Sequence, residues 1–236
     1  MQALNKEVRQ MSVTVEQALE LIYTNVKPKS MKIIAIENAV GYILAQDVIA
    51  THNLPPYDNS AMDGYAVKVE DSGQSVQVSH TIFAGDDSSE ELHASNAIKI
   101  MTGARIPFGT QCVVPMEDTT PCEGGVKLPD NLVLSKHIRL SGEDIKKDEI
   151  ILFHGDRLNA HKITLLASQG VTHVKVRKKP RVALFASGNE LKMHFEQLEE
   201  YQLYNTNTPT LLLRAEELGC EVEFIGTARD TLEDIK

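Results

Sequence analysis

Apolar side chains recur at helical spacing over residues 15–26, and this periodicity predicts an amphipathic helix that ends near Asn25. Thr14 followed by Gln17 resembles a capping box at the start of this helix. We expect the apolar stripe of the helix to pack against the rest of the chain and to take no part in chemistry. Three isoleucines within residues 33–36 then predict a short strand.

Between Gly64 and His137 the pattern changes to short β-rich runs separated by Gly, Pro, Asp and Ser. Several short strands at close spacing are typical of a small sandwich or barrel, so we expect an inserted β domain here. The expected strands cover residues 65–69, 76–83, 97–101, 111–116 and 132–134.

Helical periodicity returns after the β-rich block, with Ile163, Leu166 and Ala167 on one face and Gly170 as the expected stop. A strand over 171–176 follows. This helix and strand follow the β-rich block as the first helix and strand precede it. The two flanks are therefore expected to fold together as one domain interrupted by an insertion.

The last part of the sequence predicts a βαβ unit. A strand at 182–185 is followed by a helix capped by Thr208 with Pro209 in its first position, and then by a strand at 221–225. Such units build parallel sheets. Two strands and one helix do not cover both faces of a parallel sheet, and residues 231–236 have the pattern of a further helix start. We therefore expect either that the sequence is a fragment or that this last region is poorly ordered by itself.

A chain of 236 residues is long enough for one large domain or two smaller ones. The net charge of −9 argues against nucleic acid as a partner, and the short basic run at 177–181 is expected to be a solvated linker. The sequence has no apolar run of membrane-spanning length and no signal-peptide core, so we expect a cytoplasmic protein with no membrane partner. The three cysteines and eight histidines show no ligand spacing, which indicates inert thiols and surface or packing imidazoles.

The most distinctive stretch covers residues 54–67. Pro55 and Pro56 hold the backbone extended, and Gly64 is expected to let it turn before the next strand. On local chemistry alone, a surface turn between two strands explains the stretch equally well. Four short polar side chains lie between the prolines and the glycine: Asp58, Asn59, Ser60 and Asp63.

Four segments in sequence order resemble the molybdopterin molybdenumtransferase family, which comprises the MoeA proteins and the gephyrin E domain. They are Asp-Asn-Ser-Ala-Met-Asp-Gly-Tyr-Ala at 58–66, Ile-Met-Thr-Gly-Ala at 100–104, Ser-Gly-Glu-Asp-Ile at 141–145 and Ser-Gly-Asn-Glu-Leu at 187–191. The resemblance spans essentially the whole chain but only the first part of a typical member.

The resemblance implies a multidomain protein of the α+β and α/β classes. A split α/β first domain is expected at residues 1–50 with 146–178, and an inserted small β domain at 51–145. Residues 179–236 are expected to begin a MogA-like α/β domain with a parallel sheet, which binds molybdopterin and is incomplete here.

The resemblance also implies an enzyme of molybdenum cofactor biosynthesis. Members of the family insert molybdate into adenylylated molybdopterin with the help of Mg²⁺ and release AMP. This fragment is expected not to be fully active. Family members form homodimers and receive adenylylated molybdopterin from a MogA-type adenylyltransferase. The alternative is a non-catalytic dimeric scaffold of the same family. A nucleotide-binding regulatory module fits less well, because the Gly-x-Gly-x-x-Gly fingerprint is missing.

By resemblance, the catalytic residues are Asp63, Asp144 and Glu190, and these three together with Asp230 are the expected ligands of Mg²⁺. Cleaving a phosphoanhydride beside an oxyanion requires such a hard cation held by carboxylates. Each acid taken singly also fits a solvated loop carboxylate. The expected substrate-binding residues are Ser60, Thr102, Gly103, Arg139, Ser187 and Gly188.

The turn at residues 102–103 has two possible interpretations, and residues 189–201 depart from the family pattern. Thr102 and Gly103 are expected to offer a hydroxyl and an exposed N–H to an oxyanion, although an ordinary turn at a strand end explains them equally well. Asn189 stands where the family usually has Asp, and the loop at 192–201 lacks the usual Pro-Gly. Either change puts cation or pterin binding in doubt and leaves Glu190 as the firmer ligand.

Overall fold

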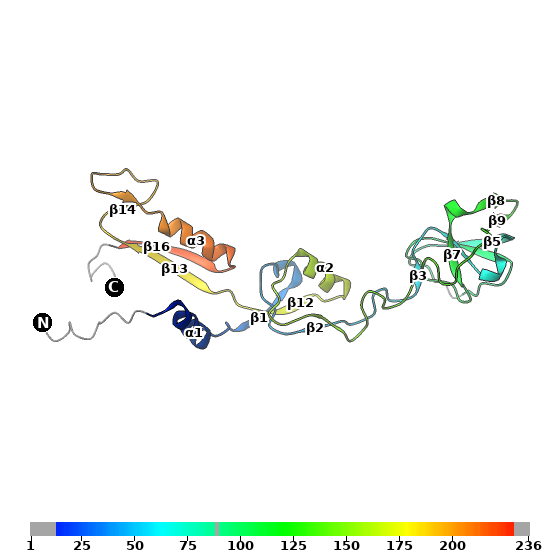
Figure 1. The fold of residues 1–236 in the computed structure, drawn as a ribbon, viewed down its shortest axis with the longest axis horizontal. Coiled ribbons are helices and arrows are strands. Elements are labelled where there is room, and N and C mark those ends of the chain that lie inside the picture. Colours follow the sequence, from blue (N-terminus) through cyan, green and yellow to red (C-terminus); the bar gives the residue numbers. More distant parts are fainter. Residues whose placement is uncertain (1–12, 88–89, 229–236) are drawn as a thin grey trace. The chain divides into compact units, whose positions relative to one another are not determined.

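The computed structural model describes residues 13–87 and 90–228, which form a mixed α/β structure with mostly β content (Figure 1). These residues divide into two compact units. The mixed unit contains residues 13–46, 154–164 and 171–228, and the β unit contains residues 47–87, 90–153 and 165–170. The helices are α1 (Val15–Asn25), α2 (Ala160–Ser168) and α3 (Asn207–Glu217), and the short 3₁₀ helices are η1 (Ile36–Asn38), η2 (Val69–Asp71) and η3 (Met116–Asp118).

The strands of the mixed unit are β1 (Met31–Ala35), β12 (His173–Arg177), β13 (Arg181–Ser187), β14 (Leu191–Lys192), β15 (Leu203–Tyr204) and β16 (Glu221–Ala228). The strands of the β unit are β2 (Val48–Ile49), β3 (Asn59–Ser60), β4 (Gly64–Val67), β5 (Ser75–Ile82), β6 (Asn96–Ile100), β7 (Cys112–Pro115), β8 (Thr120–Cys122), β9 (Gly125–Lys127), β10 (Ile138–Arg139) and β11 (Ile150–Leu152).

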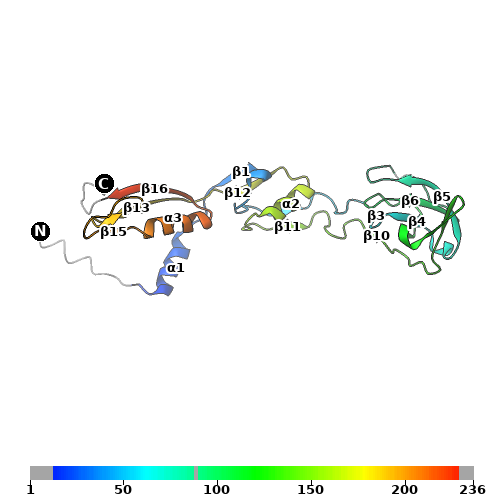
Figure 2. The same cartoon turned by 90° about the horizontal axis from the view of Figure 1, so that it is seen from above.

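In the mixed unit, strands from the two ends of the chain pair with each other. β1 and β12 are antiparallel, and Val174 and Val176 of β12 are buried. β13 and β16 are parallel, and α3 lies along this pair in both views (Figures 1 and 2). The predicted βαβ unit is therefore confirmed. The domain boundaries expected from the sequence stay a prediction.

Helix α1 forms as predicted, but its apolar stripe does not pack as expected. The Thr14 hydroxyl accepts a hydrogen bond from the Gln17 N–H, and the Gln17 side chain accepts one from the Thr14 N–H, which completes the capping box. However, no residue of α1 is buried, and Val15 and Ile22 are 71% and 52% exposed. The 3.6-residue period selects a face of the helix without specifying what covers that face.

Helix α3 begins at Asn207, one residue before the predicted cap. The carboxamide oxygen of Asn205 accepts a hydrogen bond from the Thr208 N–H at 3.0 Å, and its amide donates to the Thr208 hydroxyl at 2.8 Å. Asn205 therefore satisfies a free N–H of the first turn, which is the role that the sequence had assigned to Thr208.

The basic run at 177–181 is more ordered than a solvated linker. The Lys179 ammonium lies 4.8 Å from the centroid of the Tyr42 ring, and the Lys32 ammonium lies 4.4 Å from the same centroid. Arg177 ends β12 and donates a hydrogen bond to the Lys29 carbonyl at 3.2 Å. These cation–π contacts anchor the run to the mixed unit.

The β unit is organised around a six-stranded sheet with the strand order β7-β4-β6-β5-β9-β8. Side chains alternate across the sheet, so each face has its own buried cluster. One cluster contains Ala66, Ile98, Ile100 and Val113, and the other contains Val67, Val76, Ala97, Cys112 and Val114.

The structure corrects two sequence predictions in this unit. Residues 132–134 form no strand. Leu132 lies in a loop, where its side chain packs against the second cluster and its N–H donates to the Ser72 hydroxyl. The hairpin of β8 and β9 was not predicted, since Pro121 and two glycines obscure its β pattern. The other four predicted strands of the block are confirmed within one or two residues.

Candidate active site

The distinctive polar stretch sits at the start of β4, a strand that pairs with β6 on one side and β7 on the other. The sequence suggested that the backbone turns at Gly64. In the structure, Gly64 is instead the first residue of β4. A Cβ atom at Gly64 would lie 2.1 Å from the Val114 carbonyl oxygen, so only glycine fits this close approach of two strands. The glycine thereby fixes Asp63 at the edge of a rigid sheet.

Strand register brings Asp63 to Thr102. β4 and β6 pair Gly64 with Ile100, so the residues just beyond this pair lie beside each other. The Asp63 Oδ1 atom accepts hydrogen bonds from the Thr102 N–H at 2.7 Å and from the Thr102 hydroxyl at 2.8 Å. The backbone bond first, and the hydroxyl bond second, lower the pKa of the exposed Asp63 carboxyl. Asp63 is therefore ionised at neutral pH, and its Oδ2 has no hydrogen-bond partner among the described residues.

Ser60 and Gly103 are joined by their backbones. The Gly103 N–H donates to the Ser60 carbonyl at 2.8 Å, and the Ser60 N–H donates to the Ala104 carbonyl at 3.0 Å. The Ser60 hydroxyl is buried and donates to the Met62 carbonyl at 2.6 Å. The expectation of a free N–H at Gly103 is therefore wrong, and the Thr102 N–H is likewise engaged by Asp63. Substrate binding by these residues stays a prediction.

Arg139 is held between two carboxylates. Its Nε donates to Glu143 at 2.5 Å and its Nη2 donates to Asp144 at 2.6 Å. Glu143 also accepts a hydrogen bond from the Leu140 N–H at 2.9 Å. The Arg139 bond first, and then the Leu140 bond, lower the pKa of Glu143, and the two carboxylates raise the pKa of Arg139. The guanidinium is thus oriented by one carboxylate while it contacts the other.

The loop that carries Arg139 and Asp144 is fastened to the proline stretch. The Asp58 carboxylate accepts a hydrogen bond from the Ser141 N–H at 2.7 Å, and the Gly142 N–H donates to the Pro55 carbonyl at 3.0 Å. Strands β3 and β10 also pair Asn59 with Arg139. Asp58, Asn59, Asp63, Arg139 and Asp144 therefore belong to one continuous hydrogen-bonded and paired framework within the β unit.

From the sequence, no site role was assigned to the two residues that orient this framework, Asp58 and Glu143. A signal was present for each, since Asp58 follows the two prolines closely and Glu143 lies four residues after Arg139. The Oδ1 atom of Asn59 is buried without a hydrogen-bond partner among the described residues. A buried acceptor of this kind is normally satisfied by a water or a ligand donor.

Ser187, Gly188 and Glu190 lie in the mixed unit, from the end of β13 to the residue before β14. Ser187 is the last residue of β13, and the Gly188 N–H donates to the Ala228 carbonyl at 3.3 Å. Gly188 has a φ of +144°, and a Cβ there would lie 2.9 Å from a carboxylate oxygen of Glu190. Glycine therefore lets the Glu190 carboxylate fold back over the backbone. Asp230 lies outside the described residues.

Within residues 13–87 and 90–228, no three His, Cys, Asp or Glu side chains lie close enough together to hold a metal ion. Mg²⁺ is commonly bound through one or two carboxylates, with water and substrate phosphates completing its shell. The free Oδ2 of Asp63 suits this mode of binding. The same described residues contain no helix that is long and apolar enough to cross a membrane.

Comparison with known proteins gives consistent matches. The family model "MoeA N-terminal region (domain I and II)" matches residues 13–170. The molybdopterin molybdenumtransferase of Haemophilus influenzae is 38% identical over 209 residues, which cover 86% of this chain and 51% of that protein. The molybdopterin molybdenumtransferase of Staphylococcus epidermidis is 34% identical over 229 residues, which cover 94% of this chain and 54% of that protein. The chain thus spans about half the length of the curated relatives it matches.

Solved structures agree with the sequence matches. A crystal structure of the molybdopterin biosynthesis MoeA protein from Pyrococcus horikoshii OT3 has a TM-score of 0.84 and 29% sequence identity, covering 94% of this chain and 61% of that one. A second structure of the protein from this organism has a TM-score of 0.77 and 31% identity, covering 94% of this chain and 59% of that one.

Proposed function

Since the chain belongs to the MoeA family of molybdenum cofactor biosynthesis, we propose that it takes part in the transfer of molybdenum to molybdopterin. In the specific form of this proposal, molybdate is inserted into adenylylated molybdopterin with release of AMP. The observation that carries the proposal is the Asp63 carboxylate, which is ionised, oriented by Thr102 and left with one free oxygen.

Asp63 is proposed as a ligand of Mg²⁺ and as the main catalytic residue. When bound, the cation supplies Lewis acidity to phosphate oxygens and neutralises their charge. The two Thr102 bonds fix the carboxylate through Oδ1, so that Oδ2 points to a defined position. Asp144, Glu190 and Asp230 are proposed as further ligands. Asp144 is engaged by Arg139 in the structure, so binding a cation there requires the guanidinium to share or release this carboxylate.

The proposed substrate-binding residues differ in which hydrogen-bonding atoms they still have free. Arg139 keeps its Nη1 without a partner among the described residues, and a guanidinium suits phosphate or molybdate oxygens. Ser187 and Gly188 lie at the end of β13, where parallel strands commonly present ligand sites. Ser60, Thr102 and Gly103 support the proposal by shaping the loop that holds Asp63.

We propose that the active protein is a homodimer and receives adenylylated molybdopterin from a MogA-type adenylyltransferase. The exposed apolar stripe on α1 supports a self-association surface, because Val15, Leu19 and Ile22 are 71%, 45% and 52% exposed. A dimeric scaffold of the same family without catalytic activity is the alternative.

The test is Mg²⁺-dependent AMP release from adenylylated molybdopterin after molybdate addition, measured with the whole protein. Asp63→Asn keeps an oxygen for the Thr102 bonds but removes the charge, so AMP release is expected to fall by roughly a factor of 10² or more. Glu70→Gln, which removes an exposed carboxylate elsewhere in the β unit, is the matched control.

Normal AMP release by folded Asp63→Asn would reject the catalytic assignment. A protein that dimerises but releases no AMP with any substrate preparation would instead support the scaffold. Thermal unfolding and size-exclusion chromatography of both variants separate loss of chemistry from loss of folding or assembly.

A further inference from the structure

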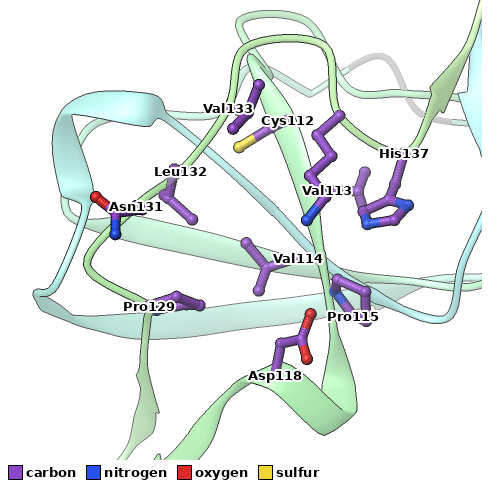
Figure 3. Close-up of a pocket in the computed structure, with 11 residues that line it drawn as sticks. Cys112, Val113, Val114, Pro115, Asp118, Pro129, Asn131, Leu132, Val133 and His137 are labelled. Carbon is purple, nitrogen blue, oxygen red and sulfur yellow. The ribbon is translucent and has the colours of Figure 1, made fainter.

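A cavity of about 220 Å³ lies against β7 in the β unit (Figure 3). Its lining combines buried apolar side chains with a few ionisable ones, as small-molecule sites do. Val114 and Leu132 belong to or pack against a buried cluster, and Pro115 and Pro129 also line the cavity. The cavity therefore has a rigid apolar floor.

Three ionisable side chains line the same cavity without being used by the protein. Lys136, His137 and Asp118 form no side-chain hydrogen bond or ion pair with any other residue in the described part of the chain. Figure 3 shows Asp118 and His137 on either side of Pro115. An ammonium group, an imidazole and a carboxylate are thus available to a ligand that contacts the apolar floor.

The turn that presents Lys136 and His137 is held in place from both sides. The Val113 N–H donates to the Lys136 carbonyl at 3.0 Å, and the Ala61 N–H donates to the His137 carbonyl at 3.0 Å. Ser135 and His137 both have positive φ, at 61° and 58°, a conformation that residues other than glycine adopt rarely. Because its backbone is hydrogen-bonded on both sides, the turn places Lys136 and His137 at the edge of the cavity before any ligand arrives.

We propose that this cavity binds a small aromatic acid with a hydrogen-bond donor at its far end. An apolar cavity of about 150 Å³ accommodates benzene, so this cavity has room for one ring and a substituent. The carboxylate of the ligand would contact Lys136 and His137, its ring would cover Val114 and Leu132, and its amino or hydroxyl group would donate to Asp118. Asp63 does not line this cavity, although its backbone carbonyl accepts a hydrogen bond from the Met116 N–H next to Pro115 at 3.1 Å. The proposal does not rest on the proposed function.

The test is an NMR titration of the whole chain with 4-aminobenzoate, benzoate, aniline and inorganic phosphate. 4-Aminobenzoate is expected to bind saturably with a Kd that is roughly millimolar or lower, and to shift the resonances of residues 112–118 and 129–137. Benzoate and aniline each lack one polar group and are expected to bind more weakly. Inorganic phosphate lacks the ring and is expected not to compete.

Substitutions in the cavity test which residue contacts each end of the ligand. Lys136→Met is expected to weaken 4-aminobenzoate about tenfold or more, and to weaken aniline little. Asp118→Asn is expected to weaken 4-aminobenzoate and to leave benzoate unchanged. Lys127→Met on β9 and Glu117→Gln in η3 are exposed controls outside the cavity and should change neither affinity.

Absence of saturable binding by 4-aminobenzoate at 10 mM or below, roughly ten times the expected Kd, would overturn the proposal. The same holds if phosphate competes as well as benzoate, since the site would then recognise charge alone. Equal affinity of Lys136→Met and Lys127→Met would also reject it. All four substituted residues are exposed or half-buried, and their amide spectra report whether each variant is folded.

Discussion

The Asp63 carboxylate receives both hydrogen bonds that Thr102 can donate, at 2.7 Å from the N–H and 2.8 Å from the hydroxyl. The two residues are 39 positions apart in the sequence and meet because β4 and β6 pair Gly64 with Ile100. Sheet register therefore orients the candidate catalytic carboxylate and lowers its pKa.

Thr102→Val removes the hydroxyl bond and keeps the backbone bond, which is the larger cause of the low pKa of Asp63. The pKa of Asp63 is expected to rise but to stay below the ordinary value of an aspartate. A carboxyl ¹³C NMR titration measures it, with Thr120→Val in β8 as the control. An unchanged Asp63 pKa in Thr102→Val would show that the hydroxyl contributes nothing.

The same interaction predicts how stability depends on pH. Because the pKa of Asp63 is lower in the folded state than in the unfolded state, its contribution to stability is present above the unfolded pKa. The contribution is lost as the pH falls through the folded pKa. The difference in the free energy of unfolding between pH 7 and acid pH, measured with urea, is therefore expected to be smaller in Thr102→Val than in the parent.

Gly64→Ala is expected to disrupt pairing between β4 and β7, because the new Cβ would lie 2.1 Å from the Val114 carbonyl oxygen. Gly124→Ala is a stringent control, since Gly124 has open space around it but a φ of +73°. If the close approach of β4 and β7 requires glycine at position 64, Gly64→Ala should lower the midpoint of thermal unfolding more than Gly124→Ala does. Equal midpoints would indicate that the sheet relaxes around the added methyl group.

Ile100→Ala removes a fully buried side chain from the centre of the six-stranded sheet. Truncations of this kind typically lower the free energy of unfolding by about 2–5 kcal/mol. Ile49→Ala, at a side chain that is 54% exposed, makes the same chemical change and should have a much smaller effect. Urea denaturation followed by circular dichroism compares the two, and similar losses would mean that Ile100 does not belong to the core.

Cys112 and Cys122 are expected to differ in reactivity. Burial raises the pKa of Cys112 to about 11, whereas Cys122 is exposed on β8. At pH 8 iodoacetamide should therefore label Cys122 quickly and Cys112 only after unfolding. Mass spectrometry of native and urea-treated protein resolves the sites, and rapid native labelling of Cys112 would contradict the packing around β7.

Local patterns in the sequence predicted most of the regular elements. The capping box at Thr14, the glycine stop at Gly170 and the parallel pair around α3 depend on residues near each other in the sequence, and all three are confirmed. The hydrophobic run at 132–134 was misread as a strand, because burial of Leu132 against a sheet face leaves the same pattern as strand burial.

The candidate site was predictable in composition but not in geometry. A family motif singled out Asp63, Arg139 and Asp144, yet nothing local indicated that Arg139 would be held between Glu143 and Asp144. The expected free N–H of Gly103 failed for a similar reason, since its acceptor, Ser60, is 43 residues away (103 − 60). Long-range pairing decides which polar groups remain free, and a single sequence does not encode that in any short pattern.

Strand β4 is hydrogen-bonded along both of its edges, and its successive side chains, Ala66 and Val67, enter opposite hydrophobic layers. Asp63 precedes this strand directly, so it cannot swing away unless two ladders and two layers loosen at once. Substitutions should therefore be tolerated better in the loops around this carboxylate than in β4, because a change in the strand disturbs both ladders and both buried clusters.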